Sequence, residues 1–321
     1  MRIFVVEPSL HSLEARRILE GLGEVEYAEC AGQESFLSQI SQGTYDALFT
    51  RFGLLVDAAV FEAVPSLRWI VTPTTGVEHI DVSEANRRKI RVISLRGEVD
   101  FLESVRSTAE HTWALLLALI RGIPSAFQDV LEGNWRRESF IGTELHGKTL
   151  GIVGCGRLGR MVAGYGLAFG MRVQAYDHDP ANISKAPQGV EYQPLDVLMS
   201  NAEVVSLHLP LTDETRGFMS RQRIFEMKRH AILLNTARGE LIDESALVEA
   251  LTTGHLAGAA LDVLAGDTLW EERTGQTDLL RYAKNSNNLI ITPHVGGCAR
   301  ESLEKTSVFI AQRFAATVKE K

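Results

Sequence analysis

A short glycine-rich segment is the part of the chain whose residue types and spacing are best suited to chemistry. Its glycines are Gly154, Gly156 and Gly159, and they follow the apolar residues 149–153. Glycines at this spacing permit a tight turn and let a pyrophosphate approach the N–H groups that begin the next helix. An ordinary glycine-rich turn would lack the apolar strand before it and the helical pattern after it. The segment therefore predicts a dinucleotide-binding turn.

An acidic residue lies at the expected distance beyond this turn. Asp177 follows the apolar run at residues 172–176, which is the next predicted strand. A carboxylate at that strand end accepts hydrogen bonds from both adenosine ribose hydroxyls and repels a 2′-phosphate. Asp177 therefore predicts that the cofactor is NAD and not NADP.

Four further segments with polar side chains each follow a predicted strand. They are residues 208–212, 235–239, 260–263 and 292–297. Loops after the carboxyl ends of parallel strands converge on one crevice in a doubly wound sheet. We therefore expect Arg238, His294 and two carboxylates to meet over the nicotinamide of the bound dinucleotide.

The elements that must position these side chains alternate between strand and helix along the chain. The first set of predicted strands is 2–6, 47–50, 68–71 and 91–94, with helical patterns at 9–22, 33–40 and 57–64. The second set of strands is 149–153, 172–176, 204–207, 231–235, 258–262 and 289–292. Each set fits a doubly wound parallel sheet, so we predict an α/β protein of two Rossmann-like lobes.

These two lobes define the predicted domains. A substrate-binding domain spans residues 1–100 and is completed by 296–321, and an NAD-binding domain spans 101–295. A long helical stretch, residues 101–121, is expected to cross between the lobes. The cleft between the lobes is the expected place of the active site, since ligands of such folds bind beyond the strand ends.

The composition is that of an ordinary globular protein of 321 residues, with 45% hydrophobic residues and a formal net charge of −8. The acidic balance and the lack of a long basic run argue against nucleic acid or an anionic membrane as a partner. Three widely spaced cysteines indicate neither a disulfide framework nor a metal site. No apolar stretch has the pattern of a signal peptide or a membrane span, so we expect a cytoplasmic protein.

The strand-end segments, in this order, resemble the D-isomer-specific 2-hydroxyacid dehydrogenase family, which includes phosphoglycerate, D-lactate and glyoxylate/hydroxypyruvate enzymes. The resemblance covers nearly the whole chain. It extends to Thr108–His111, Gly133–Arg136 and Gly147–Leu150, and to Pro73–Asp81, which resembles the family's substrate loop. It implies an NAD-dependent dehydrogenase that runs as a 2-ketoacid reductase, forms a D-2-hydroxyacid and needs no metal.

The resemblance implies a role for each matching residue of the substrate site. Arg238 would hold the substrate carboxylate and polarise the keto group, because a guanidinium stays ionised and binds a carboxylate through two parallel hydrogen bonds. His294 would be the acid/base, since imidazole gives and takes a proton near neutral pH. The backbone at Thr75 and Gly76 would hold the same carboxylate. Arg51 would add positive charge there, or would form only a surface salt bridge.

The resemblance also implies a set of cofactor-binding residues. Asp262 would lie beside the nicotinamide carboxamide, or would only cap a strand end, and His208 would line the cofactor channel, or would only pack against the sheet. The full set is Thr108, Gly154, Gly156, Arg157, Leu158, Gly159, Asp177, His208, Pro210, Thr215, Thr236, Ala237, Asp262, Gly296 and Gly297.

The chain departs from the family pattern at the acid that pairs with the histidine. Five residues after the nicotinamide aspartate the family usually has a glutamate, whereas this chain has Asp267, which is one methylene shorter. His294 could lie closer to this acid, a water could bridge the two, or Glu271 or Glu272 could take part. We predict that Asp267 is the partner and the third catalytic residue with Arg238.

The altered acid keeps a second class of function open, an NAD-sensing binding protein or corepressor on the same fold. The presence of Arg238, Asp262 and His294 together favours an enzyme. Oxidation of formate or phosphite would also transfer a hydride to NAD, but an acid near the histidine favours ketoacid chemistry. The resemblance further implies a homodimer, with the apolar helix at 113–120 and Trp135 at the subunit contact.

Overall fold

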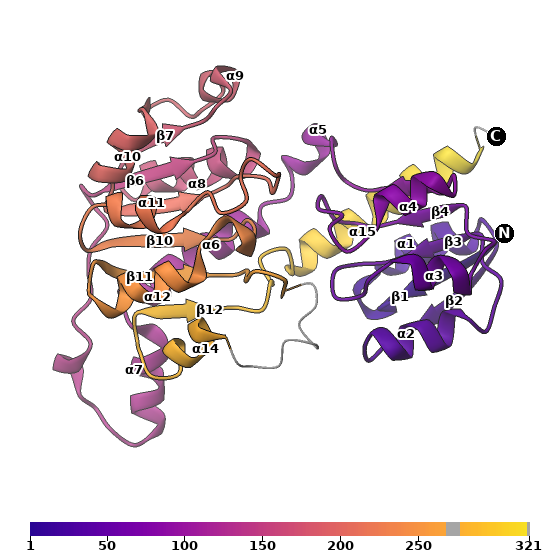
Figure 1. The fold of residues 1–321 in the computed structure, drawn as a ribbon, viewed down its shortest axis with the longest axis horizontal. Helices are drawn as coiled ribbons and strands as arrows, with labels where there is room; N and C mark the ends of the chain where they lie inside the picture. The colour runs from indigo at the N-terminus through magenta and orange to yellow at the C-terminus, as the bar shows by residue number, and fades with distance from the viewer. Residues whose placement is uncertain (268–276, 320–321) are drawn as a thin grey trace. The chain divides into compact units, whose positions relative to one another are not determined.

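The computed structural model describes residues 1–267 and 277–319, which form two compact units. The first unit contains residues 1–105 and 298–319, and the second contains residues 106–267 and 277–297. Each unit is built around one parallel sheet (Figure 1). The predicted α/β class with two Rossmann-like lobes is therefore confirmed.

The first unit has a five-stranded sheet in the order β2-β1-β3-β4-β5. Its strands are β1 (Arg2–Val6), β2 (Glu24–Ala28), β3 (Ala47–Phe49), β4 (Trp69–Val71) and β5 (Arg91–Ile93). Its helices are η1 (Pro8–Leu10), α1 (Leu13–Glu20), α2 (Gln33–Ile40), α3 (Ala58–Ala63), α4 (Val82–Arg87), α5 (Val99–Leu102) and α15 (Arg300–Lys319). All strand pairs are parallel.

Alternating side chains of β1 supply two separate cores, one on each face of this sheet. Phe4 and Val6 belong to one hydrophobic cluster, and Ile3 and Val5 belong to the other. Because side chains alternate across a strand, a strand covered on both faces must be apolar throughout, as β1 is. The second cluster also contains Phe314 of α15, so the end of the described chain packs on the first sheet.

The second unit has a seven-stranded sheet in the order β12-β11-β10-β9-β6-β7-β8. Its strands are β6 (Thr149–Val153), β7 (Arg172–Tyr176), β8 (Val190–Tyr192), β9 (Val204–Leu207), β10 (Ala231–Asn235), β11 (Leu256–Leu261) and β12 (Leu289–Ile291). Its helices are α6 (Ser107–Ile120), α7 (Ile123–Leu131), η2 (Arg137–Ser139), α8 (Arg157–Ala168), α9 (Pro180–Ser184), α10 (Leu195–Asn201), α11 (Arg221–Glu226), η3 (Gly239–Leu241), α12 (Glu244–Thr252) and α14 (Asp278–Ala283).

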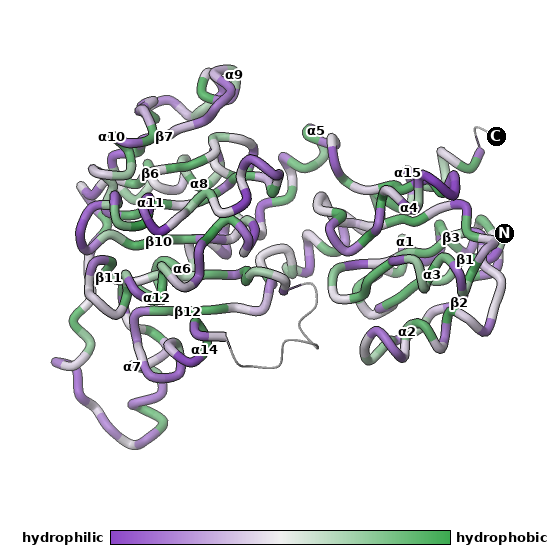
Figure 2. The backbone as a smooth tube through the Cα atoms, in the orientation of Figure 1, coloured by the Kyte–Doolittle hydropathy of each residue, from purple (hydrophilic) through white to green (hydrophobic). Residues whose placement is uncertain are grey.

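The strand order of the second sheet reverses between β6 and β9, which are paired neighbours. After β6 the chain adds β7 and β8 on one side, and it then returns to place β9 on the other side of β6. Such a reversal separates the loops beyond the strand ends and leaves a crevice for a ligand. Every residue of β6 and β9 is buried, and Figure 2 shows hydrophobic residues along the neighbouring β10.

One predicted element is wrong. The helical stretch expected at residues 101–121 is divided into α5 and α6, with a break between Leu102 and Ser107. In a continuous helix the carbonyl of Ser104 would accept an N–H from the next turn, but here it accepts from Lys305 Nζ at 3.0 Å. The Ser104 hydroxyl also donates to Phe101 O at 2.9 Å, which competes with helical hydrogen bonding.

Within the described residues, no single helix has both the length and the apolar composition needed to cross a membrane. The helices α6 and α7 satisfy that test only when they are taken together, and they are bent by 60° at the break between them. Helix α6 packs against α8 and β11, and eight of its residues are buried there.

Candidate active site

The glycine turn lies where β6 ends and α8 begins, at the point where the strand order reverses. Gly154 has φ +93°, and a Cβ there would lie 2.7 Å from the carbonyl oxygen of His208, which follows β9. A Cβ on Gly159 would overlap the carbonyl of Gly154. A Cβ on Gly156, in contrast, would meet nothing within 4 Å. The turn therefore packs tightly at Gly154 and Gly159 but is open at Gly156. A pyrophosphate at a helix N-terminus requires such an open backbone.

Asp177 holds this turn against the end of β7. It is 7% exposed, and its Oδ2 accepts a hydrogen bond from the backbone N–H of Cys155 at 2.8 Å. Its Oδ1 accepts from the backbone N–H of Asp179 at 2.9 Å and from Asn182 Nδ2 at 3.2 Å. The predicted ribose-binding carboxylate is therefore fixed beside the glycine turn, and Asn182 is a partner that the sequence did not reveal.

The segment after β9 places His208 on the other side of the turn. Its Nε2 lies 2.9 Å from Ser206 Oγ, and burial lowers the pKa of His208 to about 4. The imidazole is therefore neutral at physiological pH. In the same segment, Thr215 Oγ1 donates to the carbonyl of Pro210 at 2.6 Å, so these two predicted cofactor residues shape one loop.

Arg238 is presented by a turn that buried Asn235 builds at the end of β10. Asn235 Nδ2 donates to the carbonyl of Arg238 at 2.8 Å, and Asn235 Oδ1 accepts from the N–H of Ala237 at 3.0 Å. Thr236 Oγ1 lies 2.8 Å from Thr112 Oγ1, which ties the turn to α6. Asn235 and Thr112 were not among the predicted residues; an amide directly before the Thr-Ala-Arg-Gly segment is the signal that could have identified Asn235.

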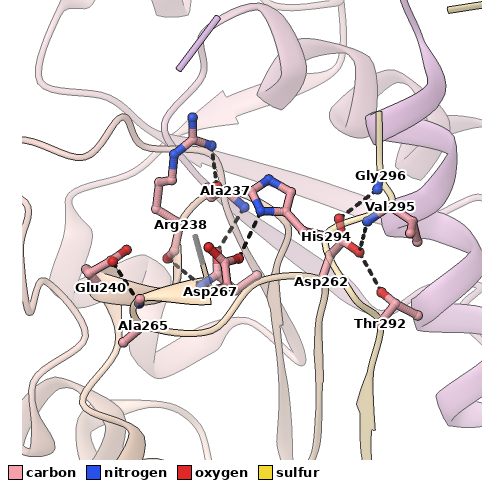
Figure 3. Close-up of polar contacts among 12 residues, drawn as sticks. Ala237, Arg238, Glu240, Asp262, Ala265, Asp267, Thr292, His294, Val295 and Gly296 are labelled. Carbon is pink, nitrogen blue, oxygen red and sulfur yellow. Dashed lines mark hydrogen bonds and ion pairs between the residues drawn. The ribbon is translucent and has the colours of Figure 1, made fainter. Parts of the chain in front are cut away.

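His294 and Asp267 make a direct contact. Nδ1 of His294 lies 2.9 Å from Oδ2 of Asp267, and the two side chains are 25% and 18% exposed. Figure 3 shows the side chains of Arg238 and His294 beside each other, next to Asp267. The shorter acid therefore reaches the histidine without a bridging water. Glu271 and Glu272, the alternative partners, lie outside the described residues.

Asp262 organises the loop that carries His294. Its Oδ1 accepts from Thr292 Oγ1 at 2.6 Å and from Val295 N at 2.9 Å, and its Oδ2 accepts from Gly296 N at 2.7 Å. Its backbone carbonyl accepts from the N–H of His294 at 2.8 Å. These bonds hold His294 at a φ of +54°, which is unusual for a residue with a side chain.

Asp262 also faces His111 of α6, which lies in a segment that resembles the family but was not among the predicted site residues. Nε2 of His111 lies 3.2 Å from Asp262 Oδ1 and 2.9 Å from Thr292 Oγ1. Burial of Asp262, which is 1% exposed, opposes its ionisation, but hydrogen bonds from His111, Thr292 and the 295–296 backbone outweigh burial and keep its pKa below the ordinary value. Asp262 is therefore an anion at neutral pH.

The remaining predicted cofactor residues surround these groups. Arg157 and Leu158 are the first residues of α8 after the glycine turn. A Cβ on Gly296 would lie 2.8 Å from Asp262 Oδ2 and 3.3 Å from Thr108 Cγ2, so Thr108 borders the same loop. A Cβ on Gly297 would meet nothing within 4 Å, which leaves the backbone there open.

The predicted substrate residues Arg51, Thr75 and Gly76 belong to the first unit, after β3 and β4. Arg51 is 8% exposed, so the alternative of a surface salt bridge is wrong. Its Nη2 donates to the carbonyl of Leu10 at 3.1 Å, and burial lowers its pKa to about 10. Thr74 Oγ1 donates to the carbonyl of Gly76 at 2.6 Å and shapes the substrate loop.

Residues 1–267 and 277–319 contain no candidate metal site. Within these ranges no three His, Cys, Asp or Glu side chains are grouped so that they could hold a metal ion. The groups that the described site offers for chemistry are the guanidinium of Arg238 and the imidazole–carboxylate pair of His294 and Asp267.

Comparisons with known proteins agree with this arrangement. Residues 113–296 match the family model of the D-isomer specific 2-hydroxyacid dehydrogenase NAD binding domain. The chain is 38% identical over 315 residues to D-3-phosphoglycerate dehydrogenase of Methanocaldococcus jannaschii, covering 98% of this chain and 56% of that protein. It is 36% identical over 278 residues to glyoxylate reductase of Pyrococcus furiosus, covering 84% of this chain and 79% of that protein.

Solved structures show the same likeness. The crystal structure of D-lactate dehydrogenase from Aquifex aeolicus, complexed with NAD and lactic acid, is 29% identical with a TM-score of 0.81, covering 100% of this chain and 96% of that one. The chain spans about half the length of the phosphoglycerate dehydrogenases that it matches, 52% and 56% in two of them. The resemblance found in the sequence is confirmed: the chain belongs to the D-isomer-specific 2-hydroxyacid dehydrogenase family and binds NAD.

Proposed function

We propose that the protein is an NAD-dependent D-2-hydroxyacid dehydrogenase that works as a 2-ketoacid reductase. The observation that supports this most strongly is the 2.9 Å contact between His294 Nδ1 and Asp267 Oδ2, beside Arg238 at the edge of the NAD-binding sheet. A cation that binds carboxylate and an acid–base pair are the two functions that reduction of a 2-ketoacid requires. The related proteins named phosphoglycerate dehydrogenase, glyoxylate reductase and D-lactate dehydrogenase support the same substrate class.

In this proposal Arg238 binds the substrate carboxylate and polarises the carbonyl at C2. Its guanidinium stays ionised throughout and fixes the substrate by parallel hydrogen bonds. Asp267 holds Nδ1 of His294 in its protonated form and stabilises the imidazolium by its negative charge. His294 then donates the proton on Nε2 to the oxygen of the former carbonyl as the D-alcohol forms. Bound NADH supplies the hydride for C2.

We propose that different residues of the second unit bind different parts of the cofactor. The open backbone at Gly156 and the start of α8 suit the pyrophosphate, and Asp177 suits the adenosine ribose. The anionic carboxylate of Asp262, held with its loop by backbone N–H groups, suits the nicotinamide side. In the first unit, Thr75 and Gly76 offer backbone N–H groups to the substrate, and Arg51 offers charge to an anionic substrate.

A panel of 2-ketoacids tests this proposal. We expect NADH absorbance at 340 nm to fall when the protein is mixed with at least one of glyoxylate, pyruvate, hydroxypyruvate or its 3-phosphate. Arg238→Lys, which keeps the charge but loses the planar fork, should raise KM for that ketoacid and leave the dissociation constant of NADH nearly unchanged. Binding of NADH without consumption in the presence of every ketoacid would favour the NAD-sensing protein instead.

We also propose a cytoplasmic homodimer formed through the second unit. Helix α7 exposes Phe127, which is 64% exposed, and the following segment exposes Trp135, which is 84% exposed. An apolar hollow of about 310 Å³, lined by residues of α6 and α8 and by Phe169, which follows α8, lies on the same unit. Large exposed apolar groups of this kind are typical of subunit contacts and not of a monomer's surface.

A further inference from the structure

The loop that carries Asp267 is a tight turn held by two glutamates. The N–H of Asp267 donates to the carbonyl of Leu264 at 3.1 Å, which closes a four-residue turn. The N–H of Gly266 donates to Glu240 Oε1 at 2.9 Å, and the N–H of Ala265 donates to Glu244 Oε1 at 2.8 Å. Both central N–H groups of the turn therefore donate hydrogen bonds to carboxylates.

The two glutamates come from the segment that follows Arg238. Glu240 lies in η3 and Glu244 is the first residue of α12, and both are half-buried. A Cβ on Gly239 would overlap the backbone of Leu264 and Ala265, so the turn packs directly on η3. Figure 3 shows Glu240 beside this turn, and it shows Asp267 between the turn and His294. One short segment thus carries the substrate-binding arginine and fixes the position of the acid.

We propose that Glu240 and Glu244 are positioning residues for Asp267. By accepting the two central N–H groups they hold the turn where the short carboxylate of Asp267 contacts His294. A carboxylate that accepts a backbone N–H forms a charge-assisted bond, which is stronger than a neutral one. The two glutamates compensate in this way for the methylene that an aspartate lacks. The inference rests on the proposed function, because it gives Asp267 its role beside His294.

Substitutions at these two glutamates can separate the effect of the hydrogen bond from the effect of the negative charge. Glu240→Gln keeps an oxygen that accepts the N–H of Gly266 but removes the charge, whereas Glu240→Ala removes both. The same pair of variants can be made at Glu244. Glu249→Ala is the matched control, because Glu249 also lies on α12 but pairs with Arg221.

The test follows the ring protons of His294 by NMR as a function of pH, in the full-length protein, with the signal assigned by its loss in His294→Ala. Asp267→Asn should move the titration of His294 to lower pH. Glu240→Ala and Glu244→Ala should each produce roughly half of that shift, because the carboxylate remains but is no longer held. The two Gln variants and Glu249→Ala should titrate like the wild type, and all variants should keep the wild-type melting temperature within about 5 °C.

The kinetic counterpart is a fall of roughly tenfold in kcat/KM for ketoacid reduction in the two Ala variants, with rescue by Gln. Two results would overturn the inference. One is a Gln variant that shifts the titration as far as its Ala variant, since charge alone would then be the cause. The other is an Ala variant with no shift although Asp267→Asn has one. If the titration of His294 is unchanged in Asp267→Asn, then Asp267 does not have the proposed role, and the inference about the two glutamates fails with it.

Discussion

At the scale of single residues, we propose that the contact between Asp267 and His294 sets how ketoacid reduction depends on pH. In the proposed mechanism reduction needs the imidazolium form of His294, and a carboxylate 2.9 Å from Nδ1 would stabilise that form. Asp267→Asn removes the charge at nearly constant size. We expect the alkaline limb of the pH profile for reduction to move to lower pH and kcat/KM at neutral pH to fall by roughly tenfold or more.

Steady-state kinetics between pH 5 and pH 10 measure this effect, and the dissociation constant of NADH is the internal control, since the cofactor residues are untouched. His294→Ala should lose far more activity than Asp267→Asn, because it removes the proton donor itself. If the pH profile is unchanged for Asp267→Asn but shifted for Glu271→Gln or Glu272→Gln, then one of these two glutamates, and not Asp267, is the acid that pairs with His294.

We propose that Asp177 governs the choice between NADH and NADPH. Its carboxylate is fixed by Cys155, Asp179 and Asn182 beside the glycine turn, where the 2′-phosphate of NADPH would meet its charge. We expect kcat/KM for NADH to exceed that for NADPH by roughly a hundredfold, and Asp177→Asn to narrow the ratio. Equal values for the two cofactors in the wild type would contradict this role; exposed His178, at 3.3 Å from Asp177, is the group that could neutralise it.

The side chains that follow strand ends could be predicted from the sequence, because a parallel sheet brings those ends to one edge. Arg238, Asp262 and His294 were identified in this way. Two of the groups that hold the site, His111 and Thr112, were not predicted, because each is distant in the chain from the residue that it contacts. His111 contacts Asp262 and Thr112 contacts Thr236 across more than a hundred residues, and no spacing rule connects such pairs.

At the scale of elements, buried His11 makes the packing of the first sheet sensitive to acid. It lies between η1 and α1, is 5% exposed and has no hydrogen-bond partner for either ring nitrogen among residues 1–267 and 277–319. Burial, with help from Arg51 and Arg16, lowers the pKa of His11 from 6.5 to about 3. Between these values the unfolded chain binds a proton that the folded chain excludes, so stability falls as the pH falls below 6.5.

His11→Leu should remove this pH-dependent contribution to the free energy of unfolding. The free energy of unfolding, measured by urea denaturation, should fall between pH 7 and pH 5 by about 2 kcal/mol less in the variant than in the wild type. His146→Leu is the control, because His146 is exposed and should leave the pH dependence unchanged. An equal loss in the wild type and in His11→Leu would show that other groups cause the acid sensitivity.

The strands and helices with strong periodicity were predicted close to their observed bounds, and the failures have physical causes. Strand β2 lies at an edge of the sheet and buries only one of its five residues, so it lacks the continuous apolar run that marks the central strands. Strand β8 is another edge strand, of three residues. The break between α5 and α6 depends on Lys305, about two hundred residues further along the chain.

At the scale of the whole molecule, the exposed apolar surface of α7 predicts a dimer. Light scattering at micromolar concentration should give about twice the chain mass of 35.4 kDa. Phe127→Glu should shift the mass toward that of one chain, because a charge would be buried at the contact. Glu132→Lys, at the exposed residue that follows α7, serves as the control for a change of charge alone. A wild-type mass of 35.4 kDa would exclude the dimer.

In the proposed reaction Arg238, His294 and bound NADH together reduce a 2-ketoacid to its D-alcohol. The most direct measurement supplies NADH with deuterium at both C4 positions and analyses the product of the best ketoacid by chiral chromatography and mass spectrometry. We predict the D-2-hydroxyacid with one deuterium at C2, formed by the wild type and nearly absent with His294→Ala. A product of L configuration, a D-product without deuterium, or full activity in His294→Ala would contradict the account.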